Sequence, residues 1–110
     1  KSASGIACTA DGGWEQGWII FEDANNNAAA DEGEEVISRG NPLAAGLRLY
    51  GNSPVDDYVS YTANGRPKTI SGALQFGTIR LCRPGNRAQR SVVISNGGRV
   101  RVEQTSGTCA

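Results

Sequence analysis

The stretch from Trp14 to Ile37 constrains the fold most strongly. It contains four consecutive large apolar or β-branched residues, Trp18 to Phe21. A short run of this kind is typical of a strand that is buried on both faces rather than of an amphipathic helix. Residues 23 to 35 are then rich in Asn, Asp, Glu and Ala, and short polar side chains favour turns because they bond to nearby backbone groups. We therefore expect a central strand, a long polar surface loop, and a return strand at residues 35 to 38.

Turn signals divide the rest of the chain into short extended segments. The expected strands are residues 4 to 9, 14 to 22, 35 to 38, 45 to 50, 58 to 61, 73 to 82, 91 to 95 and 99 to 104. The first two should form a hairpin, and a change in apolar parity predicts a β-bulge at Gly77. In the last strand, alternation predicts that Val100 and Val102 face the core. No segment has sustained helical periodicity, so we expect one mainly β domain, residues 1–110, with two antiparallel sheets.

The charges of this chain are unevenly distributed, although its net charge is zero. Residues 1 to 77 carry five Lys or Arg against ten Asp or Glu, and residues 78 to 110 carry six Arg against Glu103 alone. Such asymmetry allows an anionic partner for the C-terminal part. The alternative, which we favour, is internal compensation between Arg on one strand and acids on another.

The polar loop has the spacing of a calcium-binding loop. Its residues at positions 1, 3, 5, 7, 9 and 12 of an EF-hand pattern are Asp23, Asn25, Asn27, Ala29, Asp31 and Glu34. However, Ala28 replaces the glycine needed for the sharp turn, and a strand precedes the loop instead of a helix. We therefore expect a loop that is closed by its own hydrogen bonds and holds no metal.

The groups that catalysis requires are missing from the sequence. There is no His, no G-x-S-x-G motif, and no glycine-rich loop followed by Lys and Ser or Thr. The carboxylates are concentrated in one exposed loop, where burial cannot shift a pKa into a catalytic range. We expect no catalytic residue, no cofactor and no enzymatic activity.

Two stretches of the chain resemble a known family. The pattern W..GW.(I/V)F.D.N.N…D.GE is formed by Trp14, Trp18, Phe21, Asp23, Asn25, Asn27, Asp31, Gly33 and Glu34. It resembles the globular part of the type IV minor pilins FimU and FimT and of the type II secretion pseudopilin GspH. The far end, with Val92 to Ser95, Gly98 to Arg101 and Cys109, is similar to the same proteins. The resemblance implies the two-sheet pilin domain, and a long apolar N-terminal helix that precedes these residues and anchors the full-length protein in the inner membrane.

The three cysteines are Cys8, Cys82 and Cys109. Without His or a C-x-x-C spacing they do not indicate a zinc site. The resemblance implies a C-terminal disulfide region, residues 82 to 109, and a Cys82–Cys109 bridge there would contribute about 3 to 4 kcal/mol. Such a bridge requires an oxidising compartment, such as the periplasm or the cell surface. Cys8 would then be a free buried thiol or would pair with a cysteine in a preceding segment.

Gly98-Arg99-Val100-Arg101 is a candidate DNA-binding motif. Arginines at alternate strand positions share one face about 7 Å apart, close to the phosphate spacing along one DNA strand. In FimT-like proteins a Gly-Arg-x-Arg motif near the C-terminus is implicated in DNA binding during natural transformation, which would give Arg99 and Arg101 that role. The alternative is a hairpin whose arginines are simply solvated.

The resemblance favours a minor pilin, a structural subunit in type IV pilus assembly or initiation near the pilus tip. Its partners would be other minor pilins and the major pilin, at the pilus, the cell surface or in the periplasm. One alternative is a FimT-like minor pilin that binds DNA. Another is a GspH-like pseudopilin of type II secretion, whose partners would be other pseudopilins.

Overall fold

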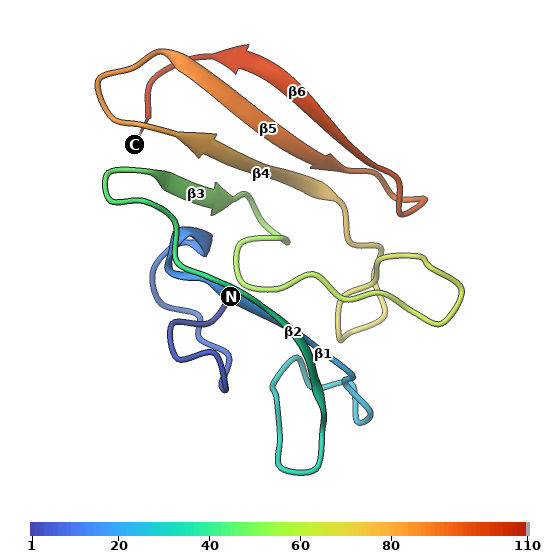
Figure 1. Cartoon of the computed structure of the whole chain (residues 1–110). Helices are drawn as coiled ribbons and strands as arrows, with labels where there is room; N and C mark the ends of the chain where they lie inside the picture. The colour runs from blue at the N-terminus through green and yellow to red at the C-terminus, as the bar shows by residue number, and fades with distance from the viewer. Residues whose placement is uncertain (110) are drawn as a thin grey trace.

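A computed structural model describes residues 1 to 109, which contain six strands and one short 3-10 helix (Figure 1). These elements are η1 (Trp14–Gln16), β1 (Trp18–Phe21), β2 (Val36–Gly40), β3 (Arg48–Gly51), β4 (Gly77–Cys82), β5 (Ala88–Ile94) and β6 (Val100–Ser106). The strands form two antiparallel sheets, a β1-β2 pair and a four-stranded sheet in the order β3-β4-β5-β6. The predicted mainly β fold with two antiparallel sheets is confirmed. No helix in this part of the chain has the length and apolar character needed to cross a membrane.

The first sheet contains the strand, loop and return strand that the sequence predicts. β1 pairs with β2 from Trp18 opposite Gly40 to Phe21 opposite Val36, and the polar loop connects them. The expectation that β1 is a central strand buried on both faces is wrong. β1 has one neighbouring strand, and Ile20 is 52 % exposed whereas Ile19 is buried. The reason is that the N-terminal segment covers only one face, where Arg39, opposite Ile19, donates a hydrogen bond from Nε to the Gly5 carbonyl oxygen (2.7 Å).

The N-terminal hairpin predicted for residues 4 to 9 and 14 to 22 does not form. Residues 3 to 7 make bends in which the hydroxyl oxygens of Ser2 and Ser4 accept hydrogen bonds from the backbone N–H groups of Gly5 and Ala7 (both 3.1 Å). These local bonds compete with strand pairing. Trp14 to Gln16 form η1 instead of a strand, and β1 begins only after Gly17.

Two further expected strands are shorter than predicted. The segment at 45 to 50 becomes β3 only from Arg48, because the Leu47 N–H bonds to the Ala44 carbonyl in a turn (3.2 Å). The segment at 58 to 61 forms only an isolated bridge between Tyr61 and Pro67. The first is limited by this turn. In the second, the Ser60 N–H and the Tyr58 carbonyl oxygen bond to the Gln75 side chain (both 2.8 Å) and not to another strand.

The β-bulge predicted at Gly77 is absent. β4 begins at Gly77 and pairs with β5 in unbroken register, from Gly77 opposite Ile94 to Leu81 opposite Arg90. The apolar residues change from even to odd positions at Gly77 for a simpler reason. Leu74 lies before β4 and makes an isolated bridge to Lys68, so it is not part of the same strand as Ile79 and Leu81.

Alternation along the four-stranded sheet separates its side chains into two faces. One face, called the apolar face, carries Leu49, Ile79, Leu81, Val92, Ile94, Val100 and Val102, and at its end next to the β4-β5 turn it also carries Ala88, Arg90, Gln104 and Ser106. The opposite face, called the polar face, carries Arg48, Tyr50, Thr78, Arg80, Cys82, Gln89, Ser91, Val93, Arg101, Glu103 and Thr105. Cys82, Gln89 and Ser91 on this face are buried. The prediction that Val100 and Val102 face the core is wrong, because they are 51 % and 62 % exposed. They lie on the edge strand β6, and nothing in residues 1 to 109 covers that part of the apolar face.

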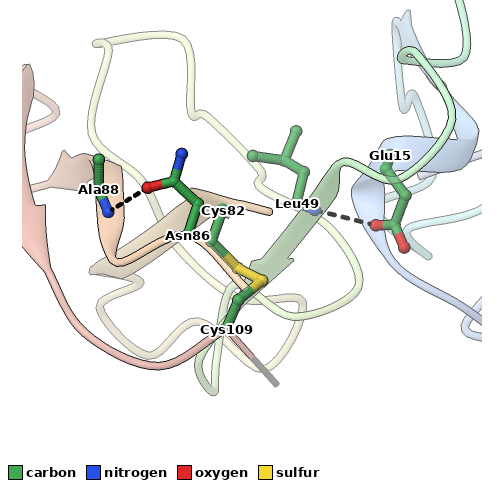
Figure 2. The surroundings of a disulfide bond; sticks show 6 residues. All are labelled: Glu15, Leu49, Cys82, Asn86, Ala88 and Cys109. Carbon is green, nitrogen blue, oxygen red and sulfur yellow. Dashed lines mark hydrogen bonds between the residues drawn. A yellow bond between two sulfur atoms is a disulfide. The ribbon is translucent and has the colours of Figure 1, made fainter. Parts of the chain in front are cut away.

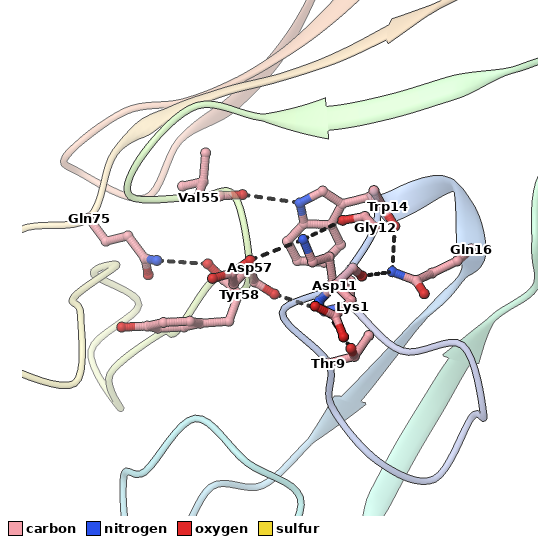
Figure 3. Close-up of polar contacts among 11 residues, drawn as sticks. Lys1, Thr9, Asp11, Gly12, Trp14, Gln16, Val55, Asp57, Tyr58 and Gln75 are labelled. Carbon is pink, nitrogen blue, oxygen red and sulfur yellow. Dashed lines mark hydrogen bonds and ion pairs between the residues drawn. The ribbon is translucent and has the colours of Figure 1, made fainter.

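Buried polar contacts join the segments between the two sheets (Figure 3). Trp14 donates from Nε1 to the Val55 carbonyl oxygen (3.1 Å), and Gln75, which is fully buried, donates from Nε2 to the carbonyl oxygens of Pro54 (2.9 Å) and Tyr58 (2.8 Å). Nearby, the Lys1 ammonium lies 3.0 Å from the Asp57 carboxylate. These contacts fix the segment between β3 and β4 to the N-terminal part of the chain.

Candidate functional site

The turn between β5 and β6 presents the candidate DNA-binding motif. The Ser95 N–H donates to the Arg99 carbonyl oxygen (2.9 Å), and the Gly98 N–H donates to the Ser95 carbonyl oxygen (3.0 Å). Gly98 has a φ of 87°, and a Cβ there would collide with the Gly65 carbonyl oxygen. Glycine is therefore required at this position for both its conformation and its close packing.

Arg99 and Arg101 are both exposed at the edge of the sheet. The Arg101 side chain is not free, because its Nε lies 2.8 Å from Oε1 of Glu103, two residues along the same strand. Both partners of this ion pair are exposed, so it contributes less than about 1 kcal/mol and is screened by salt. Arg99 forms no ion pair with any residue from 1 to 109. The motif thus offers one unpaired guanidinium and one that an anion would have to share with Glu103.

The other C-terminal arginines do not extend this motif into one basic patch. Arg83 and Arg87 lie at the turn between β4 and β5, and Arg90 lies near the beginning of β5. The β5-β6 ladder runs from Ala88 opposite Ser106 to Ile94 opposite Val100, so this group and Arg99 are separated by about 20 Å. The arginines at the β4-β5 turn are therefore separate from Arg99, and Arg80, which is half-buried in the middle of β4, belongs to neither group.

The polar loop is closed by its own hydrogen bonds. The Asp23 carboxylate accepts from the backbone N–H groups of Asn27 (3.2 Å) and Ala28 (2.7 Å), and Glu34 accepts from those of Ala24 (2.8 Å) and Asp31 (2.9 Å). The side-chain amides of Asn25 (2.8 Å) and Asn27 (2.5 Å) donate to the Asp31 carboxylate.

These two amides, with Asn25 contributing most, lower the pKa of Asp31 because they stabilise the ionised carboxylate. Because the pKa is lowered, the stabilisation of the loop by these two hydrogen bonds to ionised Asp31 is present at neutral pH. It is lost only when the pH falls below the ordinary carboxyl range.

Because the carboxylates of Asp23, Asp31 and Glu34 already accept hydrogen bonds, we predict that the loop does not bind calcium tightly. Calorimetric titration of the chain with calcium should show no site with a dissociation constant below about 10⁻⁴ M, which is within the range of known loop sites. A tighter site that is lost in Asp23→Ala would contradict this prediction.

The C-terminal end of the chain is attached to the sheet by a disulfide between Cys82 and Cys109 (Figure 2). Their Cα atoms are 5.6 Å apart, and Cys82 is buried at the end of β4. The adjoining turn is closed by a hydrogen bond from the Ala88 N–H to Oδ1 of Asn86 (2.9 Å). Cys8 is a half-buried free thiol.

The interpretation that the two halves of the chain compensate one another's charge is wrong. Residues 1 to 109 contain two ion pairs, Lys1–Asp57 and Arg101–Glu103, and neither joins the acidic half to the basic half. Within the described residues, the opposite charges of the two halves therefore do not pair.

Comparison with known proteins identifies the family of this chain. A family model described as type II transport protein GspH matches residues 2–98, whereas no curated protein and no solved structure matches the chain. The match includes Gly98 but not Arg99, Arg101 or Cys109. The family comprises structural proteins of the pilin and pseudopilin type rather than enzymes. They are generally periplasmic and membrane-associated, and they associate with other such subunits in filaments. Because the match covers most of its length, the chain belongs to the GspH family of type II transport proteins.

Proposed function

We propose that this chain is a filament subunit whose apolar face packs against apolar helices in the body of the filament. The observation that carries this proposal is the exposure of Val100 and Val102 on the face where Ile94 and Val92 lie opposite them. Large contiguous apolar surfaces on soluble domains are typical of interaction sites. The principal extents of the molecule are 42 × 30 × 19 Å, so it is thin in one direction. A sheet normally requires a second layer over its apolar face, and an apolar helix supplies one.

The subunit would be a minor pilin of the FimU/FimT type, near the tip of a type IV pilus, with other minor pilins and the major pilin as neighbours. This assignment is supported by the resemblance of the Trp14 to Glu34 stretch. A pseudopilin of type II secretion is the alternative within the same family. Deletion of the gene distinguishes the two, because loss of twitching motility with normal secretion supports the minor pilin. Loss of secretion with normal twitching supports the pseudopilin.

We predict that the double substitution Val100→Asp and Val102→Asp prevents assembly without unfolding the domain. Both side chains are exposed, so the free energy of unfolding should change by less than about 1 kcal/mol. Two carboxylates against an apolar helix would have to be desolvated without partners, which is strongly unfavourable. The measurement is the amount of the subunit in sheared filaments, alongside thermal unfolding of residues 1–110.

A matched control is Arg101→Asp together with Thr105→Asp, on the polar face of the same strand. The control protein should assemble normally. If the apolar-face variant assembles as well as the wild type, or if the control is equally defective, the apolar face is not the assembly surface.

A second candidate function is DNA binding through the β5-β6 hairpin. The observation that favours it is that the exposed Arg101 side chain lies on the face of β6 opposite to Val100 and Val102, so packing of the apolar face would not cover it. Replacing Arg99 and Arg101 with Gln should flatten the log–log salt dependence of DNA affinity by roughly 1.8, because about two phosphate contacts are removed. Gel-shift titrations at several ionic strengths measure this slope. Equal binding by the Gln variant, or no DNA shift by the wild type at low salt, would leave only the structural role.

A further inference from the structure

The two parts of the fold carry opposite and uncompensated charge. The four-stranded sheet with its connecting turns, residues 48–51 and 77–109, holds seven Arg against Glu103, a balance of +6. The remaining residues hold four Lys or Arg against ten Asp or Glu, a balance of −6. No ion pair within residues 1 to 109 connects these two sets. The molecule therefore has a basic end and an acidic end.

The acidic end is the loop between β1 and β2. Residues 22 to 35 contain six Asp or Glu and no Lys or Arg. Three of these carboxylates bond to the loop itself, as described above, whereas the exposed side chains of Glu22, Glu32 and Glu35 make no hydrogen bond within the described residues. In Figure 1 this loop, drawn in cyan, lies at the opposite end of the molecule from β6. It is therefore available to a neighbouring molecule.

The basic end contains a groove beside the turn between β4 and β5. Its volume is about 360 Å³, and its lining combines Arg83 and Arg90 with Leu47, Leu81 and Ala88, but no acidic residue. Gln89 also lines the groove, is only 5 % exposed, and has no hydrogen-bond partner for Nε2 within residues 1 to 109. A buried amide without an acceptor is unfavourable. This groove therefore presents two exposed arginines, Arg83 and Arg90, without an ion pair and without a neighbouring carboxylate.

We propose that copies of this chain associate head to tail, with the Glu32–Glu35 end of one polar loop in the Arg83–Arg90 groove of the next copy. Each arginine can bind a carboxylate through two parallel hydrogen bonds. Arg101 is a poorer binding site for a carboxylate, because Glu103 already pairs with it. The two surfaces differ and lie at opposite ends, so the contact is heterologous. The proposal identifies a contact between globular domains and does not depend on the packing of the apolar face.

Sedimentation velocity of residues 1–110 at about 20 mM and about 300 mM salt tests this contact, since screening at the higher salt shortens the range of the attraction. The wild type should associate reversibly at low salt and become monomeric at high salt. Glu32→Arg with Glu35→Arg, the loop variant, should weaken self-association at least about tenfold, and so should Arg83→Glu with Arg90→Glu, the groove variant. A mixture of the two variants should associate again, because each reversed surface then meets an opposite charge.

Arg99→Glu with Arg101→Glu is the matched control, since it changes the net charge as much as the groove variant does. The control should associate like the wild type, with circular dichroism confirming that every variant is folded. A monomeric wild type at low salt and protein concentrations up to about 1 mM would overturn the proposal. So would a failure of the mixed variants to associate, or a control as weak as the groove variant. None of these outcomes bears on the filament role, because no filament is present in the experiment.

Discussion

Gln75→Ala should lower the free energy of unfolding by about 3 to 5 kcal/mol. Gln75 is fully buried, and besides the two carbonyl oxygens that it bonds, its Oε1 accepts from the Ser60 N–H (2.8 Å). Truncation leaves three backbone groups without their partner, and each buried unpaired group costs about 1 to 3 kcal/mol. Urea unfolding measures the change. Gln104→Ala is the control, because Gln104 is exposed and its loss should cost less than about 0.5 kcal/mol. A cost below about 1 kcal/mol for Gln75→Ala would mean that this side chain does not hold the segment together.

Replacing both Cys82 and Cys109 with Ser should destabilise the domain by about 3 to 4 kcal/mol. The bridge spans a sequence separation of 27 residues, and removing it lets the C-terminal segment sample many more conformations in the unfolded state. The melting temperature should fall by roughly 10 °C or more, as scanning calorimetry can measure.

Cys8→Ser is the control for this change, because Cys8 forms no disulfide, and it should have a much smaller effect. Peptide mapping without reductant should recover Cys82 and Cys109 in one linked peptide pair. Two free thiols in oxidised protein, or a double Ser variant as stable as the wild type, would contradict this account.

Local sequence signals predicted the parts of the fold that depend on neighbouring residues. The strand at Trp18 to Phe21, the polar loop after it and the turn at Asn96 to Gly98 each follow from side chains within a few positions. Burial could not be predicted in this way, because it depends on segments that are distant in the sequence. Val100 and Val102 alternate as core residues do, yet their face is uncovered.

Residues 74 to 76 are a second case in which burial could not be predicted from the local sequence. Leu74 and Phe76 are large apolar residues, but they are 48 % and 52 % exposed, while Gln75 between them is fully buried. The cause is the set of backbone groups at Pro54, Tyr58 and Ser60, which only a side-chain amide can satisfy. Those groups come from a different part of the chain, so no local pattern indicates them.

The sequence indicated the arginines of the candidate sites but not the contacts that these arginines make. Arg99 is exposed, and so is every residue of β6, including Arg101 and Glu103. The ion pair between Arg101 and Glu103 was not anticipated. The groove at Arg83 and Arg90 was missed because Leu47, before β3, contributes to it as well. The excess of Arg after residue 78 was the one sequence signal that pointed towards it.

The most direct test of the filament role is photo-crosslinking from single positions of β6 in assembled filaments. A photoreactive residue replacing Val102 lies on the apolar face, and one replacing Glu103 lies on the polar face of the same strand. We predict a strong adduct from position 102 to a peptide of an apolar filament helix, and little or none from position 103. Equal labelling from both positions, or no helix adduct from position 102, would contradict the proposal that the apolar face packs within the filament.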